Sequence, residues 1–159
     1  MTTSRPDLRF ILAHPAHFLA FGLGAGLAPK APGTAGTLVA VPLYFLLLPL
    51  GSWYWLVVAL ALLVGVWLCA VAGRALGEHD HGGIVWDEIA AFLLVLPFAP
   101  QNAAGLALAF VLFRLFDIWK PFPIRWFDRH VPGGFGVMLD DVLAAGYAIL
   151  CLMGLAAWI

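Results

Sequence analysis

The sequence WYWLVVALALLVGVWLCAVAG, residues 53–73, runs for 21 residues without a charged side chain. A bilayer core of about 30 Å is crossed by roughly 20 helical residues, so this stretch predicts a transmembrane helix. Further apolar stretches, each shorter or carrying prolines or acids, are candidate spans at residues 36–50, 84–97, 103–119 and 139–159. We therefore predict an all-α integral membrane helical bundle of about five short spans.

The segment before these stretches, residues 7–27, differs from them. His14 and His17 lie one helical turn apart, and the pair His14-Pro15 interrupts the apolar run that follows Arg9. A cleaved signal peptide would have a continuous apolar region there. We expect this segment to be retained as an interfacial amphipathic helix, followed by the looser, glycine-rich residues 22–26. The chain is expected to form a single domain over residues 1–159.

The composition excludes several classes of protein. Hydrophobic residues make up 64% of the chain and charged residues 11%, against roughly 45–50% and about 25% in soluble domains. The formal net charge is −1, and no basic stripe is present that could bind nucleic acid. Cys69 and Cys151 both fall in apolar stretches and have no metal or redox spacing, so we interpret them as buried hydrophobic residues.

All charged side chains can be placed on one side of the membrane. The short connections at residues 51–52 and 100–102 carry no charge, whereas every Lys and Arg lies in the segments on the other side. The positive-inside rule then places that charged side at the cytoplasm. We expect four arginines to set the orientation and touch anionic lipid: Arg5, Arg9, Arg125 and Arg129. We expect Glu78, Asp80 and Asp128 to be solvated.

The segment PKAPGTAGT, residues 29–37, precedes the first candidate span. Lys30, Thr34 and Thr37 lie there beside backbone N–H groups at a helix N-terminus, which together could bind a phosphate. The spacing is not that of a Walker A motif. The alternative is a capping loop with a lysine that reaches to the membrane surface.

Two adjacent acids, Asp87 and Glu88, open the candidate span at residues 84–97. One acid at this position would be explained by the helix dipole and by capping. A second acid, next to an apolar run and at membrane depth, favours a bound cation or a proton.

The richest cluster combines FRLFDIWKPFPI, residues 113–124, with GGFGVMLDD, residues 133–141. Arg114 and Asp117 share a helix face, and Lys120 is expected to continue that face before a proline ends the helix. Asp140 and Asp141 are expected to open the last helix after a glycine-rich turn. An intrahelical ion pair with a snorkelling lysine is the structural alternative, but ionisable residues inside membrane segments are usually functional.

These clusters place several carboxylates at the same membrane depth: Asp87, Glu88, Asp117, Asp140 and Asp141. Hard oxygen ligands in this number suit Mg²⁺. The nearby cations suit a phosphate: Lys30, Arg114 and Lys120. Carboxylates, a divalent ion and phosphate-binding cations at a membrane surface indicate phosphoryl chemistry on a lipid headgroup.

The same motifs resemble those of the phosphatidylglycerophosphatase A family of bacterial membrane proteins. The resemblance covers residues 22–147 and rests on PGTAGT at 32–37, WDE at 86–88, and the two blocks at 113–124 and 133–141. It differs in two places: Ala90-Ala91 stand where a glycine is usual, and Thr37 where a serine is common.

The resemblance implies Mg²⁺-dependent hydrolysis of the terminal phosphate of phosphatidylglycerophosphate, a phospholipid in the bilayer. This is the last step of phosphatidylglycerol synthesis, at the cytoplasmic face of the bacterial inner membrane. The expected metal ligands are Asp87, Glu88, Asp117, Asp140 and Asp141. The expected catalytic residues are Glu88, Asp117, Asp140 and Asp141. The expected phosphate-binding residues are Lys30, Thr34, Thr37, Arg114 and Lys120.

Two questions stay open at the level of sequence. The nucleophile could be a metal-bound water, or Asp117 or Asp140 through an aspartyl-phosphate. The alternative function is a small ion or proton carrier that uses the carboxylate cluster, which would favour acids spread along a path across the bilayer. A purely structural membrane subunit is a third reading.

Overall fold

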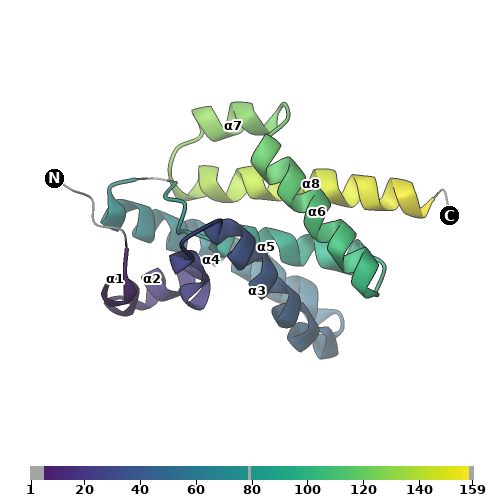
Figure 1. Ribbon diagram of the computed structural model, residues 1–159, viewed down its shortest axis with the longest axis horizontal. Coiled ribbons are helices and arrows are strands. Elements are labelled where there is room, and N and C mark those ends of the chain that lie inside the picture. Colours follow the sequence, from purple (N-terminus) through teal and green to yellow (C-terminus); the bar gives the residue numbers. More distant parts are fainter. Residues whose placement is uncertain (1–5, 79, 158–159) are drawn as a thin grey trace.

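Helices account for every regular element in the part of the chain that the computed structural model describes, residues 6–78 and 80–157 (Figure 1). The α-helices are α1 (Leu8–Leu12), α2 (Pro15–Ala20), α3 (Pro32–Leu47), α4 (Trp53–Leu76), α5 (Trp86–Val95), α6 (Ala103–Trp119), α7 (Ile124–His130) and α8 (Gly133–Ala156). Short 3-10 helices are η1 (Gly22–Leu27), η2 (Leu48–Leu50) and η3 (Leu96–Phe98). The all-helical prediction is therefore confirmed.

Helix α5 lies at the centre of the bundle. It packs against α3, α4 and α8, and α6 crosses α8 (Figure 1). Most of its residues are buried, and Phe92 and Val95 have no exposed surface. A helix buried on every side has to be apolar all round, which explains the sequence IAAFLLV at residues 89–95.

Three helical stretches are long and apolar enough to cross a membrane: Pro32–Leu50, Trp53–Leu76 and Gly133–Ala156. Helix α5 has 10 residues and α6 has 17, so the structure does not confirm five full spans. Large apolar side chains lie on the outside of the long helices; Leu46 is 72% exposed and Leu63 is 70% exposed. Such extensive exposed apolar surface is expected of helices that face lipid.

The two uncharged connections lie at the same end of the bundle, the uncharged end. The Tyr44 hydroxyl donates to Gln101 Oε1 over 3.1 Å, and the rings of Trp55 and Phe98 lie 6.2 Å apart. The acids of α5 and α8 and the basic residues of α6 meet at the opposite, charged end, around one cavity. The helices therefore alternate in direction as the charge pattern predicts.

Several helix boundaries differ from the predicted ones, most of all at the N-terminal segment and at the starts of α3 and α8. Helix α3 begins at Pro32, four residues before the predicted start, and α8 begins at Gly133 instead of residue 139. The predicted helix at residues 7–27 is instead divided into α1, α2 and η1.

Close helix packing explains the early start of α8. A Cβ on Gly134 would overlap the Val66 carbonyl oxygen of α4 and lie against Ala70. Gly134 therefore serves an approach between two helix backbones, where no side chain fits. Gly133, with a left-handed φ of 78°, and Gly136, whose Cβ would overlap the Val131 carbonyl oxygen, serve the turn into α8.

The fold predicts which ends of the helices face the cytoplasm. In a chain lacking Cys69 and Cys151, we expect Ser52→Cys to react with a membrane-impermeant maleimide in intact cells. We expect Glu78→Cys to react only after permeabilisation, because the basic residues near it stay inside. Both positions are exposed, so low accessibility cannot cause a difference. The reverse labelling pattern would show that the orientation is wrong.

Candidate active site

The acidic pair Asp87-Glu88 lies in the first turn of α5, whose start is fixed by two hydrogen bonds. Val85 N–H donates to the Ala20 carbonyl, and the Trp86 indole donates to the Ala61 carbonyl, each over 2.9 Å. Asp87 is only 5% exposed. Both acids are thus held at the charged end of the bundle, at the favourable positive end of a helix dipole.

Asp140 and Asp141 face the same place from α8. They lie two turns inside this helix, because it begins at Gly133, and so they do not open it as predicted. Both are buried, with 6% and 3% exposure. One carboxylate oxygen from each of Asp87, Glu88 and Asp141 lies within 4.8 Å of the others, a spacing that a single cation could bridge.

Arg114 brings α6 into the site. Its Nη1 lies 2.5 Å from Asp117 Oδ2 and 3.5 Å from Glu88 Oε1. Asp117 and Asp141 line the same cavity. Arg114 therefore links α6 to α5 through Glu88. Its ion pair with Asp117 is the one that the i,i+3 spacing predicts.

Lys120 reaches the site by a route that differs from the prediction. Helix α6 ends at Trp119, and Lys120 is its C-cap, with a left-handed φ of 47°, so it does not continue the helix face. Its Nζ donates to Asp140 Oδ2 over 2.5 Å and to Asp128 Oδ1 over 2.7 Å. Burial lowers the pKa of Lys120, but Asp140 and Asp128 outweigh it and raise the pKa overall. The ammonium therefore stays charged.

These side chains line one cavity of about 340 Å³. Its carboxylates are Asp80, Asp87, Glu88, Asp117, Asp140 and Asp141, and its cations are Arg114 and Lys120. The first residues of α3 form another wall, where a Cβ on Gly33 would overlap Glu88 Oε1. The cavity is thus strongly negative, and an anionic substrate would be repelled from it without a further cation.

The unpartnered atoms of the cavity fit a divalent cation. Among the described residues no hydrogen-bond partner exists for the buried oxygens Asp87 Oδ1, Glu88 Oε2, Asp140 Oδ1 and Asp141 Oδ1. Buried polar atoms are nearly always paired, and a group of unpaired carboxylate oxygens is the ligand set of a hard cation such as Mg²⁺. The residues present therefore suit the metal that the sequence predicts.

The remaining predicted residues lie outside this cavity lining. Lys30 is exposed, and Thr34 is half-buried one residue beyond Gly33. Thr37 is fully buried, and its hydroxyl donates to the Gly33 carbonyl over 2.8 Å, within the helix. The PGTAGT segment contributes the first turn of α3 to the site through Pro32 and Gly33.

Sequence reasoning missed three residues of the site. Asp80 lines the cavity, Asp128 binds Lys120, and Gly33 makes room for Glu88. Both acids were expected to be solvated; Asp80 is exposed as expected, whereas Asp128 is half-buried and bound by Lys120. Asp128 lies on α7, and no local pattern in the sequence relates it to Lys120. Only Gly33, which lies inside the PGTAGT motif, could have been identified from the sequence.

Comparisons with known proteins point to one family. The family model described as phosphatidylglycerophosphatase A matches residues 18–156. A phosphatidylglycerophosphatase A of Escherichia coli K12 is 48% identical over 139 residues, covering 86% of this chain and 80% of the relative. One from Haemophilus influenzae is 45% identical over 161 residues, covering 99% of both.

A third relative, from Bacteroides thetaiotaomicron, is provisionally named a phosphatidylinositol-3-phosphatase. It is 39% identical over 148 residues, which cover 87% of this chain and 91% of the relative. No solved structure matches the chain with statistical significance.

The match extends over nearly the whole chain and includes every helix that contributes to the carboxylate cavity. The chain therefore belongs to the phosphatidylglycerophosphatase A family of phosphatases.

Proposed function

We propose that this protein hydrolyses the terminal phosphate of phosphatidylglycerophosphate to give phosphatidylglycerol and phosphate, with Mg²⁺ as cofactor. The observation that carries the proposal is the group of buried, unpartnered carboxylate oxygens at the charged end of an apolar bundle. The names of two relatives that span most of the chain support the substrate. We place the reaction at the cytoplasmic face of a bacterial inner membrane, crossed several times by the chain.

The metal ligands in this proposal are Asp87, Glu88 and Asp141, whose oxygens converge, with Asp117 and Asp140 beside them. Bound Mg²⁺ would supply Lewis acidity toward the phosphoryl oxygens and the attacking nucleophile. The chain's contribution is to hold these ligands rigidly: α5 and α8 are packed together, and Arg114 fixes Asp117.

The phosphate contacts in this proposal are Arg114 and Lys120, which line the cavity. Each is already held by carboxylates, so neither has to be ordered when substrate binds. Lys30 and Thr34 lie near the start of α3 and would contact the headgroup at the mouth of the cavity. Thr37 acts on this wall through its bond to the Gly33 carbonyl.

Hydrolysis breaks the bond between phosphorus and the glycerol oxygen. Water attacks the phosphorus directly, or Asp117 or Asp140 attacks first and water then cleaves the resulting aspartyl-phosphate. In either route, water is consumed overall: the glycerol oxygen leaves with a proton as the free hydroxyl of phosphatidylglycerol, and the rest of the water is retained in the released phosphate. Glu88 and Asp141 line the same cavity and would serve as proton acceptors. The gathering of acids at one end, with none along a path to the uncharged end, disfavours the ion-carrier alternative.

The metal requirement can be tested with purified protein in detergent. We expect phosphate release from phosphatidylglycerophosphate with Mg²⁺, and a fall of at least about 100-fold in EDTA, since Lewis-acid stabilisation contributes several kcal/mol. Excess Mg²⁺ should restore the rate. An undiminished rate in EDTA would refute the metal assignment, and no release under either condition would refute the activity.

Removing single carboxylate charges tests the ligand assignment. We expect Asp117→Asn and Asp141→Asn each to lower turnover by about 100-fold or more, because metal and transition-state contacts are lost. Bound Mn²⁺, counted by electron paramagnetic resonance, should fall for Asp141→Asn. Glu78→Gln is the matched control, since Glu78 is exposed and outside the cavity. Near-wild-type turnover in the two Asn variants would contradict their roles.

The close approach of α3 to Glu88 gives a test that keeps every charge. In Gly33→Ala the added Cβ would overlap Glu88 Oε1 and lie 3.1 Å from Arg114 Nη1. We expect turnover to fall about 10- to 100-fold, since small displacements of catalytic groups are costly. Gly146→Ala, which has open space, should keep its turnover. Equal turnover in both variants would show that the wall does not position Glu88.

A further inference from the structure

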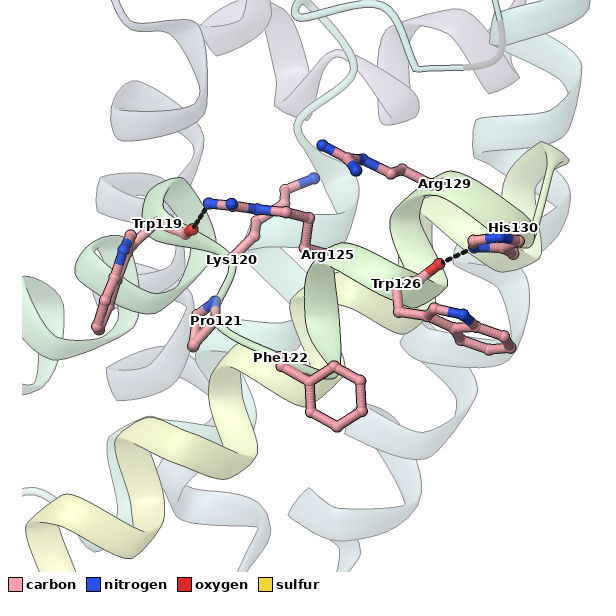
Figure 2. Close-up of a pocket in the computed structure, with 8 residues that line it drawn as sticks. All are labelled: Trp119, Lys120, Pro121, Phe122, Arg125, Trp126, Arg129 and His130. Carbon is pink, nitrogen blue, oxygen red and sulfur yellow. Dashed lines mark hydrogen bonds between the residues drawn. The ribbon is translucent and has the colours of Figure 1, made fainter.

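A second cavity, of about 420 Å³, lies beside the carboxylate cavity, at the turn between α6 and α7 (Figure 2). The residues that line it include Trp119, Lys120, Phe122, Arg125, Trp126 and Arg129. We call it the aromatic-basic pocket. Helix α7 packs on α8, and Tyr147 of α8 donates to the Phe122 carbonyl over 3.0 Å, so the pocket is attached to the helix that carries Asp140 and Asp141.

The charge of this pocket is opposite to that of its neighbour. Arg125 donates to the Trp119 carbonyl over 2.9 Å, and no carboxylate in the described part of the chain lies within ion-pair distance of Arg125 or Arg129. Asp128, which lies between them in sequence, is bound to Lys120 instead. Two guanidinium groups are thus left to attract an anion, and arginine binds phosphate oxygens in a bidentate manner.

The apolar lining indicates that the anion belongs to a lipid. Phe122 is 81% exposed, Trp119 60% and Trp126 49%. In Figure 2 the side chains of Arg125 and Arg129 extend to the left, and the rings of Phe122 and Trp126 lie below them. Aromatic rings beside basic groups are typical of the membrane interface, where the rings meet acyl chains and the cations meet headgroups.

Lys120 connects the two cavities, because it lines both of them. A phosphomonoester in the carboxylate cavity would therefore have the aromatic-basic pocket next to it. Phosphatidylglycerophosphate carries a phosphodiester one glycerol unit away from its terminal phosphate. The inositol lipid named for the third relative likewise has a phosphodiester next to its phosphomonoester.

We propose that the aromatic-basic pocket binds the phosphodiester of the lipid substrate through Arg125 and Arg129. It thereby selects lipids that carry a phosphodiester beside the phosphate to be removed. This inference rests on the proposed function, and it assigns to the two arginines a specificity role that is separate from setting membrane orientation.

The test compares two substrates in micelles of uncharged detergent with Mg²⁺: phosphatidylglycerophosphate and phosphatidic acid, which has a phosphomonoester and no phosphodiester. The specificity ratio is kcat/KM for phosphatidylglycerophosphate divided by kcat/KM for phosphatidic acid. In the double variant Arg125→Gln/Arg129→Gln, we expect this ratio to fall at least about tenfold, because charge-assisted hydrogen bonds are lost. The fall should come mainly from a higher KM for phosphatidylglycerophosphate. The double Arg→Lys variant should recover part of the ratio.

Arg74→Gln is the control, because it makes the same kind of substitution, one arginine to glutamine, in the exposed last turn of α4, outside the pocket. Its ratio should equal that of the wild type. An unchanged ratio in the double variant, or an equal loss on both lipids, would overturn the proposal. A wild-type protein that releases no phosphate from phosphatidylglycerophosphate would instead overturn the proposed function.

Binding of phosphatidylglycerol gives a second test of the assignment, because this lipid has the phosphodiester and no phosphomonoester. In EDTA and without turnover, we expect short-chain phosphatidylglycerol to bind the wild type at least about tenfold more tightly than the double Gln variant. With Mg²⁺ it should compete with the substrate. Stimulation of phosphatidic acid hydrolysis by added phosphatidylglycerol would show that the pocket holds a separate anionic lipid, and would overturn the assignment.

Discussion

The buried carboxylates of Asp87, Asp140 and Asp141 impose the main energetic constraint on this protein, because burying a charge without a partner costs several kcal/mol. Among the described residues, only Asp140 of these three has an ion-pair partner, Lys120. The other ion pairs of Arg114 and Lys120 are with the neighbouring acids Glu88, Asp117 and Asp128. The carboxylates lining the cavity still outnumber these cations. The divalent cation that we propose would offset this excess of negative charge.

The packing of the helices follows from this constraint. Helix α5 is short and central, so its charged first turn can be enclosed while the rest of it stays apolar. Gly134 lets α8 approach the backbone of α4, and Gly33 lets α3 approach Glu88. These contacts set the distances between carboxylates, which is why small residues matter at positions that carry no chemistry.

The two cavities at the charged end have complementary charge. One is rich in carboxylates and suits a metal with a phosphomonoester. The other has exposed aromatic rings and two guanidinium groups without a carboxylate partner among the described residues, and it suits a lipid phosphodiester. Lys120 lies between them and is held by Asp140 and Asp128. The left-handed turn at Lys120 therefore joins the carboxylate cavity to the aromatic-basic pocket.

The sequence by itself determined the helical class, the single charged end and the acids and bases that meet there, because hydropathy, periodicity and charge are local properties. It also identified Arg114, Asp117 and the family. Only the tertiary structure decided that Asp140 lies two turns inside α8, that Lys120 leaves its helix to bind Asp128, and that Thr37 bonds within α3. Those outcomes depend on how closely two backbones approach and on which partner is then nearest, and neither distance is encoded in the spacing of residues along one helix.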